Sequence, residues 1–239
     1  MNAQYTFDTF IPGPNNASAF SHIRAAAAAP GMAAQNPIFL YGPASSGKTH
    51  LLHAMGNSLL QQGFRNVICI TLEAFLSELI SAIHQGTLLR NSPRYTSAEA
   101  LLIDDIHMLL DKEATQNELF FLINQFLRAG KPVMLTSCLP LEDYLPLQEL
   151  LPFQEIRLSL PEAEERLTIA RQRAAMLHVE VSEAVLYYLS ARADNVRQIE
   201  GGLKRILAYQ ELLSPGMTTG QILEMLSEQW LPAIRRTPD

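Results

Sequence analysis

One stretch of eight residues has the composition and spacing of a phosphate-binding loop. It matches the pattern G-x-x-x-x-G-K-[ST] at every fixed position and reads Gly42-Pro43-Ala44-Ser45-Ser46-Gly47-Lys48-Thr49. In such a loop, backbone N–H groups and a helix N-terminus surround the phosphates of a nucleotide. Lys48 is then expected to reach the β- and γ-phosphates, and the Thr49 hydroxyl to ligate Mg²⁺. The stretch, extended to His50, therefore predicts a site for ATP or ADP with Mg²⁺.

A second candidate site consists of two carboxylates at the end of an apolar run. Asp104 and Asp105 directly follow Ala100-Leu101-Leu102-Ile103. Downstream of a phosphate loop, this is the pattern of an acidic strand end that handles Mg²⁺ and water. We expect Asp104 to hold the metal, through water, and Asp105 to orient the attacking water. Two solvated acids at a strand end would look the same, but the phosphate loop favours the catalytic interpretation.

The elements that must position these residues alternate between strands and helices. Residues 36–41 form an apolar run before the phosphate loop, and residues 50–60 have helical spacing after it. Strands are also expected at 66–71, 100–104 and 132–138, with helices at 18–29, 72–85 and 113–128. Residues 86–97 are expected to form a loop or a short broken helix, and 139–161 to be irregular. Beyond them only helices are expected, at 162–178, 182–191, 195–213 and 218–229.

This order predicts an α/β domain followed by an α-helical domain. We place the nucleotide-binding domain at 1–160, the helical domain at 161–231 and a polar tail at 232–239. No run is apolar and long enough to cross a bilayer, and the first residues lack the features of a signal peptide. Cys69 and Cys138 are expected to be small core residues of buried strands in a reducing cytoplasm, rather than a disulfide or a metal site.

The net charge of −6 argues against a protein that coats duplex nucleic acid by itself. We therefore expect no sequence-specific binding of duplex DNA. Arg90, Arg94 and Tyr95 could bind a single strand weakly, although a solvated loop is the simpler interpretation. His107 follows the acidic pair and could touch the site, or could have no catalytic role.

Several motifs together resemble the AAA+ module of the DnaA family of bacterial replication initiators. The resemblance covers nearly the whole chain and rests on residues 5–10, 13–16, 36–42, 47–54, 101–107 and 195–203. It implies a parallel sheet flanked by helices and followed by a small helical lid. It also implies that Arg197 reaches from the lid to the β- and γ-phosphates, a task suited to a planar, permanently charged guanidinium. Pro12, Gly13 and Asn16 match the positions that line the family's adenine pocket.

Three departures from the family pattern modify this expectation. The DNA-binding and helicase-contact domains have no counterpart, so we expect a short paralogue with the architecture of the regulatory Hda proteins. Pro152 stands where the family carries its arginine finger, and the only nearby arginine, Arg157, lies several residues on, in an expected strand. Cys138 replaces an acidic sensor residue, which leaves Thr136 or Ser137 to orient the water. We therefore expect nucleotide binding with slow or weak ATP hydrolysis.

The resemblance implies an ATP- or ADP-binding regulator of chromosome replication initiation that contacts DnaA or another AAA+ subunit. One alternative is a helicase loader, which would deliver the replicative helicase to single-stranded DNA. Another is a scaffold in which bound nucleotide is structural. Residues 148–153 loosely resemble peptides that dock on sliding clamps, although packing of their leucines is the simpler interpretation. The sign of regulation and the oligomeric state stay open.

Overall fold

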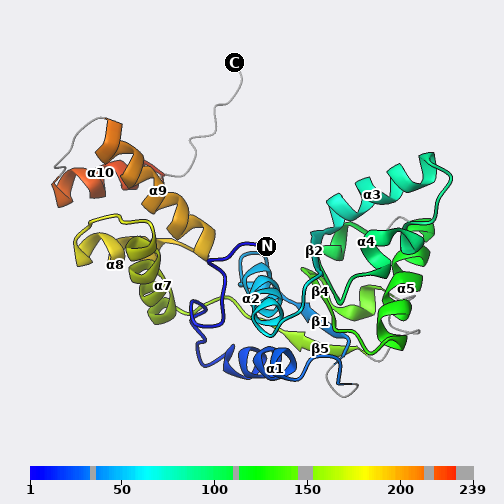
Figure 1. Ribbon diagram of the computed structural model, residues 1–239. Helices are drawn as coiled ribbons and strands as arrows, with labels where there is room; N and C mark the ends of the chain where they lie inside the picture. The colour runs from blue at the N-terminus through cyan, green and yellow to red at the C-terminus, as the bar shows by residue number, and fades with distance from the viewer. Residues whose placement is uncertain (33–35, 110–112, 145–152, 213–217, 230–239) are drawn as a thin grey trace. The chain divides into compact units, whose positions relative to one another are not determined.

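A five-stranded parallel sheet forms the centre of the first part of the chain (Figure 1). The computed structural model describes residues 1–32, 36–109, 113–144, 153–212 and 218–229. The strand order is β2-β3-β4-β1-β5, and every neighbouring pair is parallel. This confirms the predicted sheet, whose strands are β1 (Ile38–Tyr41), β2 (Val67–Thr71), β3 (Ala100–Asp104), β4 (Val133–Ser137) and β5 (Gln154–Arg157).

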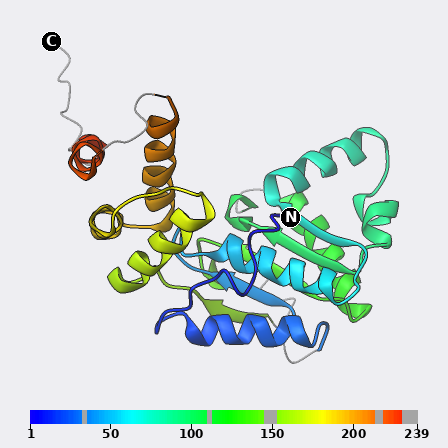
Figure 2. The ribbon, with the colours of Figure 1, turned by 60° about the vertical axis from the view of Figure 1, so that its left-hand side comes forward.

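Helices cover both faces of the sheet (Figures 1 and 2). One face carries α1 (Ala17–Ala28) and α2 (Lys48–Gln61). The other carries α3 (Leu72–His84), η2 (Leu89–Asn91), α4 (Pro93–Thr96) and α5 (Glu113–Arg128). Two further short 3₁₀ turns, η3 (Ile106–Leu109) and η4 (Leu141–Asp143), follow β3 and β4.

The alternation of side chains along the strands divides the core into two clusters. In β3, Leu101 and Ile103 pack on the side of α3 and α5, whereas Ala100 and Leu102 pack on the side of α1 and α2. Successive side chains of a strand point to opposite faces, and both faces are covered here. This explains why β3 is apolar at consecutive positions rather than at alternate ones.

Contacts within the chain divide it into two compact units, Met1–Leu160 and Pro161–Asp239. In the described residues, the second unit consists of helices around its own core. Glu162 and Glu165 form a capping box at the start of its first helix, with Glu162 N–H donating to Glu165 Oε2 at 3.1 Å. The helices are α7 (Ala163–Met176), α8 (Glu183–Arg192), α9 (Val196–Leu212) and α10 (Thr219–Gln229).

Strand β5 lies within residues 139–161, which were expected to be irregular apart from a strand at Arg157; β5 ends at that residue, and only Ile156 in it is buried. One prediction about local structure was wrong. Cys138 does not belong to a buried strand, because β4 ends at Ser137 and Cys138 is partly exposed.

Among the helices of the described residues, none has the length and apolar character needed to span a bilayer.

Candidate nucleotide-binding site

The candidate site lies where three adjacent parallel strands end. The phosphate loop follows β1, Asp104 ends β3, and β4 lies between these two strands. In parallel sheets, ligands bind beyond the carboxyl ends of the strands. The topology therefore brings together the loop and the acidic pair, which are more than fifty residues apart in the sequence.

Two glycines give the phosphate loop its path. Gly42 has φ +154° and Gly47 has φ +105°, in the region that side chains with a Cβ disfavour. A Cβ on Gly42 would lie 2.0 Å from the Leu158 carbonyl oxygen, and one on Gly47 would lie 2.8 Å from the Phe10 ring. Both positions therefore require glycine, for backbone conformation and for space.

The start of α2 presents backbone donors to the loop. The N–H of Leu51 donates to the Gly47 carbonyl at 3.0 Å. The N–H groups that precede Leu51, from Lys48 to His50, have no carbonyl four residues back within the helix. Together with the helix dipole, they make this terminus suited to an anion.

The Lys48 side chain is buried inside the turn of the loop. Its Nζ donates to the carbonyl oxygens of Gly42 and Pro43, both at 2.8 Å, and lies 3.6 Å from Cys138 Sγ. Rotation of the Lys48 side chain would therefore bring its ammonium group to a phosphate bound in the loop.

A threonine from β4 connects the two acids of β3. The Thr136 hydroxyl donates to Asp104 Oδ1, and the N–H of Asp105 donates to Thr136 Oγ1 at 3.0 Å. Asp104 is buried, whereas the Asp105 side chain is 39% exposed and its backbone is left-handed, with φ +58°. The two carboxylates therefore lie in different surroundings, one buried and one partly exposed.

The hydroxyls of β4 are already engaged within the protein. Ser137 Oγ lies 2.9 Å from the Tyr144 hydroxyl and accepts the N–H of Leu139 at 2.8 Å. The donor hydrogen of Thr136 is directed to Asp104. These bonds argue against the expectation that one of the two hydroxyls orients the attacking water.

The oxygen donors near the loop fit a hard divalent cation. Thr49 is in the first turn of α2, and the Asp104 carboxylate is fixed by Thr136. Hydroxyl and carboxylate oxygens are ligands that Mg²⁺ accepts, usually together with waters and phosphate oxygens. The residues predicted to hold Mg²⁺ thus have suitable chemistry.

The N-terminal segment lies over α2 (Figure 2), and two of its residues contact the His50 side chain. His50 Nε2 lies 2.9 Å from the Thr6 carbonyl oxygen, and its ring stacks on Tyr5 with the centroids 4.8 Å apart. The predicted contribution of His50 to the phosphate site can therefore come from its backbone N–H, while its side chain anchors the segment.

Asn16 connects the same segment to the end of the first unit. Its Oδ1 accepts the N–H of Ser159 at 2.8 Å, and its Nδ2 donates to the Ser159 carbonyl at 3.1 Å. Asn16 is 2% exposed. Gly13 is also buried, and its carbonyl accepts the N–H groups of Asn16 and Ala17 at 2.9 Å each, whereas Pro12 is exposed. Both the oxygen and the nitrogen of the Asn16 amide thus form hydrogen bonds with the backbone of Ser159. The sequence did not predict this contact.

Arg197 is the second residue of α9 in the helical unit and is exposed. The start of α9 is capped by Asn195, whose Oδ1 accepts the N–H of Gln198 at 3.1 Å. The described residues show no hydrogen bond or ion pair that holds the guanidinium. Its contact with phosphates stays a prediction, and so does the absence of an arginine finger, since Pro152 lies outside the described residues.

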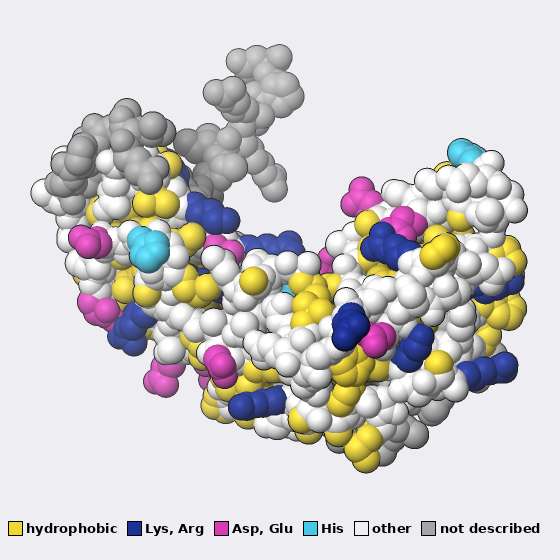
Figure 3. All heavy atoms as spheres, viewed as in Figure 1, with side chains coloured by type: hydrophobic (Ala, Val, Ile, Leu, Met, Phe, Trp, Pro, Cys, Tyr) yellow, Lys and Arg dark blue, Asp and Glu magenta, His cyan; other side chains and the backbone are white. Residues whose placement is uncertain are grey.

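The groups considered for single-stranded DNA are engaged within the protein. Tyr95 is 1% exposed and its hydroxyl donates to Glu78 at 2.9 Å, so it offers no face to a base. Arg94 pairs with Glu78 at 2.5 Å and Arg90 with Glu118 at 2.6 Å. On the face seen in Figure 3, the basic side chains of the first unit lie apart, with acidic and apolar groups between them.

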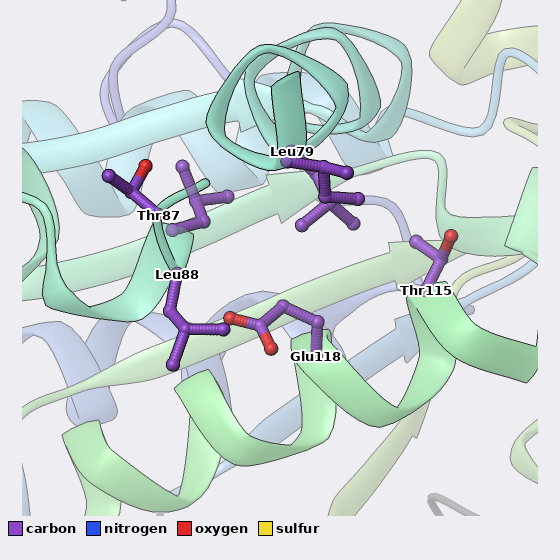
Figure 4. Close-up of a pocket in the computed structure, with 7 residues that line it drawn as sticks. Leu79, Thr87, Leu88, Thr115 and Glu118 are labelled. Carbon is purple, nitrogen blue, oxygen red and sulfur yellow. The ribbon is translucent and has the colours of Figure 1, made fainter. Parts of the chain in front are cut away.

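A separate pocket of about 250 Å³ lies among α3, η2 and α5 (Figure 4). Glu118 contributes a carboxylate, of which one oxygen binds Arg90 while the other is buried without a hydrogen bond to any described residue. The remaining walls are mainly leucine and isoleucine, which suits an apolar group rather than a phosphate. The lining residues are Leu79, Ile83, Thr87, Leu88, Leu89, Thr115 and Glu118.

Comparison with known proteins finds relatives that share this architecture. DnaA, the chromosomal replication initiator protein, of Lactiplantibacillus plantarum is 35% identical over 233 residues, which are 95% of this chain and 51% of that protein. DnaA of Thermus thermophilus is 33% identical over 239 residues, which are 97% of this chain and 55% of the relative. The chain thus spans about half the length of these curated relatives.

Solved structures give the same result. Domain III of DnaA from Thermotoga maritima superposes with a TM-score of 0.84 at 31% identity, covering 95% of this chain and 98% of that one. A DnaA bound to AMPPCP and single-stranded DNA has a TM-score of 0.77 at 29% identity, covering 95% of this chain and 69% of the other. Residues 1–151 match the family described as the bacterial DnaA ATPase domain. With this match over more than half of its length, the chain belongs to the bacterial DnaA ATPase domain family.

Proposed function

We propose that this chain binds ATP or ADP with Mg²⁺ and regulates replication initiation by contact with DnaA or another AAA+ subunit. The observation that carries the proposal is the phosphate loop, in which two glycines fit where a Cβ would clash and Lys48 lies inside the turn. The names of its relatives and the AMPPCP-bound neighbour support the nucleotide and the biological process.

In this proposal, the loop residues from Gly42 to His50 bind the phosphates through backbone N–H groups, and Lys48 moves from the loop carbonyls to the β- and γ-phosphates. Thr49 and Asp104 hold Mg²⁺, which when bound neutralises phosphate charge. Arg197 supplies a second cation from the helical unit. Pro12, Gly13 and Asn16 lie beside the adenine, with Asn16 acting through its pairing with Ser159.

Hydrolysis is expected to be slow, with Asp105 polarising the water. Cys138 follows β4 where the family pattern has an acid, and the hydroxyls of Thr136 and Ser137 are engaged with protein groups. Fewer groups are thus available to orient a water molecule. This favours a nucleotide-dependent binding protein over an efficient ATPase.

Contact with DnaA is proposed to be one-sided. In this proposal the chain keeps its nucleotide-binding residues, while Pro152 stands where the family pattern has the arginine that would reach a neighbour's nucleotide. A subunit of this kind can receive an arginine finger without supplying one. It would therefore bind to one end of a filament of DnaA subunits and prevent the addition of further subunits there.

The partner is tested by capture of purified proteins on the immobilised chain, with ATP, with ADP and without nucleotide. We expect DnaA to be retained, and more strongly with ATP. Lys48→Ala should abolish the difference between nucleotides, whereas Lys131→Ala should keep it, because Lys131 Nζ donates to the Ala98 carbonyl away from the loop. Retention of the replicative helicase instead of DnaA would contradict the proposal and favour helicase loading.

A further inference from the structure

We propose that Asp105, His107 and Cys138 form a binding site for Zn²⁺ or a similar borderline divalent cation. These ligands are different from Thr49 and Asp104, which are proposed to hold Mg²⁺, and the proposal for Cys138 departs from the expectation that neither cysteine belongs to a metal site. We further infer that a cation at this site blocks ATP hydrolysis by occupying Asp105. This second step rests on the proposed function, whereas the binding of the cation does not.

The fold brings the three ligands together from adjacent strands. Asp105 and His107 follow β3, and Cys138 follows β4, its parallel neighbour. One ligand atom of each residue lies within 4.8 Å of the others, and His107 Nδ1 is 3.9 Å from Asp105 Oδ1. Tetrahedral Zn²⁺ with bonds of about 2.0–2.3 Å sets its ligand atoms about 3.3–3.8 Å apart. Side-chain rotations that move these atoms by about 1 Å would therefore complete the site.

The ligand atoms have few competing partners among the described residues. His107 Nδ1 is buried and makes no hydrogen bond there, an unusual situation for a buried nitrogen. Cys138 Sγ accepts one long hydrogen bond, of 3.6 Å, from Lys48 Nζ. The side chains of His107 and Asp105 are 35% and 39% exposed, so an ion can enter and a water can complete its shell.

The donor set determines the class of cation. A sulfur, an imidazole nitrogen and a carboxylate oxygen suit Zn²⁺ and other first-row divalent ions, whereas Mg²⁺ takes oxygen ligands. Cys138 would release its thiol proton to solvent as it binds. Three protein ligands leave one open position, which is the arrangement of an accessible site rather than of a closed structural one.

A second thiol–imidazole pair provides an internal control. Cys69 Sγ lies 3.5 Å from His53 Nδ1, but no carboxylate completes this pair into a group of three ligands. In the described residues, the one group of three metal-ligating side chains consists of Asp105, His107 and Cys138. Burial also raises the pKa of Cys69 to about 11, which disfavours the thiolate that a metal needs. A cation that requires Cys138 but not Cys69 would thus identify the proposed site.

Occupation of the site would remove Asp105 from its catalytic role. A carboxylate that ligates a cation cannot also polarise the attacking water. The phosphate loop does not take part in the site, so nucleotide should stay bound. The cation would thereby hold the protein in its ATP-bound state.

The test of binding is a titration of the chain with Co²⁺, a spectroscopic substitute for Zn²⁺, without nucleotide. We expect a sulfur-to-cobalt charge-transfer band in the near ultraviolet, which Zn²⁺ abolishes by displacement. Cys138→Ser should remove the band, and His107→Gln should weaken binding by at least about 10–100-fold, the loss that follows removal of an outer-shell partner alone. Cys69→Ser and His53→Gln should bind as the wild type does. No band in the wild type, or a band that survives Cys138→Ser, would overturn the proposal.

The consequence is tested with Zn²⁺ and ATP. Nucleotide binding should be unchanged by Zn²⁺, while turnover by the wild type and by Cys69→Ser should stop. Turnover by Cys138→Ser, compared with its own rate without Zn²⁺, should not respond. Equal inhibition of all three proteins would refute the inferred block. If the chain binds no nucleotide, the proposed function fails, and the cobalt titration still decides the cation site.

Discussion

Replacement of Thr136 by valine tests how the acidic pair is held. Thr136 is fully buried, and its hydroxyl donates to Asp104 and accepts the N–H of Asp105. Thr136→Val keeps the shape of the side chain but leaves a buried carboxylate without its donor and a backbone N–H without its acceptor. The perturbation therefore removes two hydrogen bonds and little packing.

The expected loss of stability is about 2–4 kcal/mol. A hydrogen bond to a charged group contributes about 1.5–3 kcal/mol, and an unpaired buried N–H costs about 1–3 kcal/mol, with incomplete additivity because the two share one oxygen. Thr136→Ser is the matched control. It keeps the hydroxyl and loses one buried methyl, which should cost about 1 kcal/mol.

Peptide-resolved hydrogen exchange measures this loss in the sheet itself. Amides of β3 and β4 in Thr136→Val should lose about 30- to 1,000-fold in protection, which corresponds to about 2–4 kcal/mol at 1.36 kcal/mol per tenfold change. The serine variant should lose much less. Equal protection in the two variants would show that the hydroxyl does not hold Asp104 and Asp105, and would refute this reasoning.

Three further predictions concern the loop, the N-terminal segment and a histidine of α2. In chemical denaturation, Gly42→Ala should lower the free energy of unfolding more than Gly63→Ala does. Both glycines have positive φ, but only a Cβ at position 42 would clash with Leu158. Equal losses of free energy in the two variants would exclude the clash. Asn16→Ala should cost about 1–3 kcal/mol and speed proteolysis near Ser159, since both hydrogen bonds to that residue are lost; unchanged cleavage would contradict this role. Burial lowers the pKa of His53 below 6.5. Between the lowered pKa of the folded state and 6.5, the folded state binds fewer protons than the unfolded state, so the stability of the protein falls as the pH falls through this range. Denaturation midpoints at several pH values should show a shallower acid loss in His53→Gln, and an unchanged slope would count against the assignment.

The sequence predicts those parts of the candidate site whose residues lie in one continuous segment at fixed spacing. The phosphate loop has required residue types at set positions, and the strand before Asp104 is apolar throughout because both faces of the sheet are covered. These local signals, together with the family resemblance, were enough to predict a parallel sheet flanked by helices and a helical region after it. The sheet and the family are confirmed.

The sequence did not show contacts between distant segments. The pairing of Asn16 with Ser159 joins residues 143 positions apart, and the bridge from Thr136 to Asp104 depends on β4 lying beside β3. Tyr95 lies in residues 86–97, where turn residues and two arginines predicted a solvated loop or a short broken helix, yet packing against the core buries its side chain. Such features follow from tertiary packing, which a linear pattern does not contain.

The central claim is that the phosphate loop binds nucleotide through Lys48. Calorimetric titration with ATP and ADP in the presence of Mg²⁺ tests it most directly. The wild type and Lys131→Ala should bind alike, and Lys48→Ala should bind at least about 10–100-fold more weakly, since a charge-assisted hydrogen bond contributes about 1.5–3 kcal/mol. Equal affinity of the wild type and Lys48→Ala, or no binding by a folded wild type, would contradict the account.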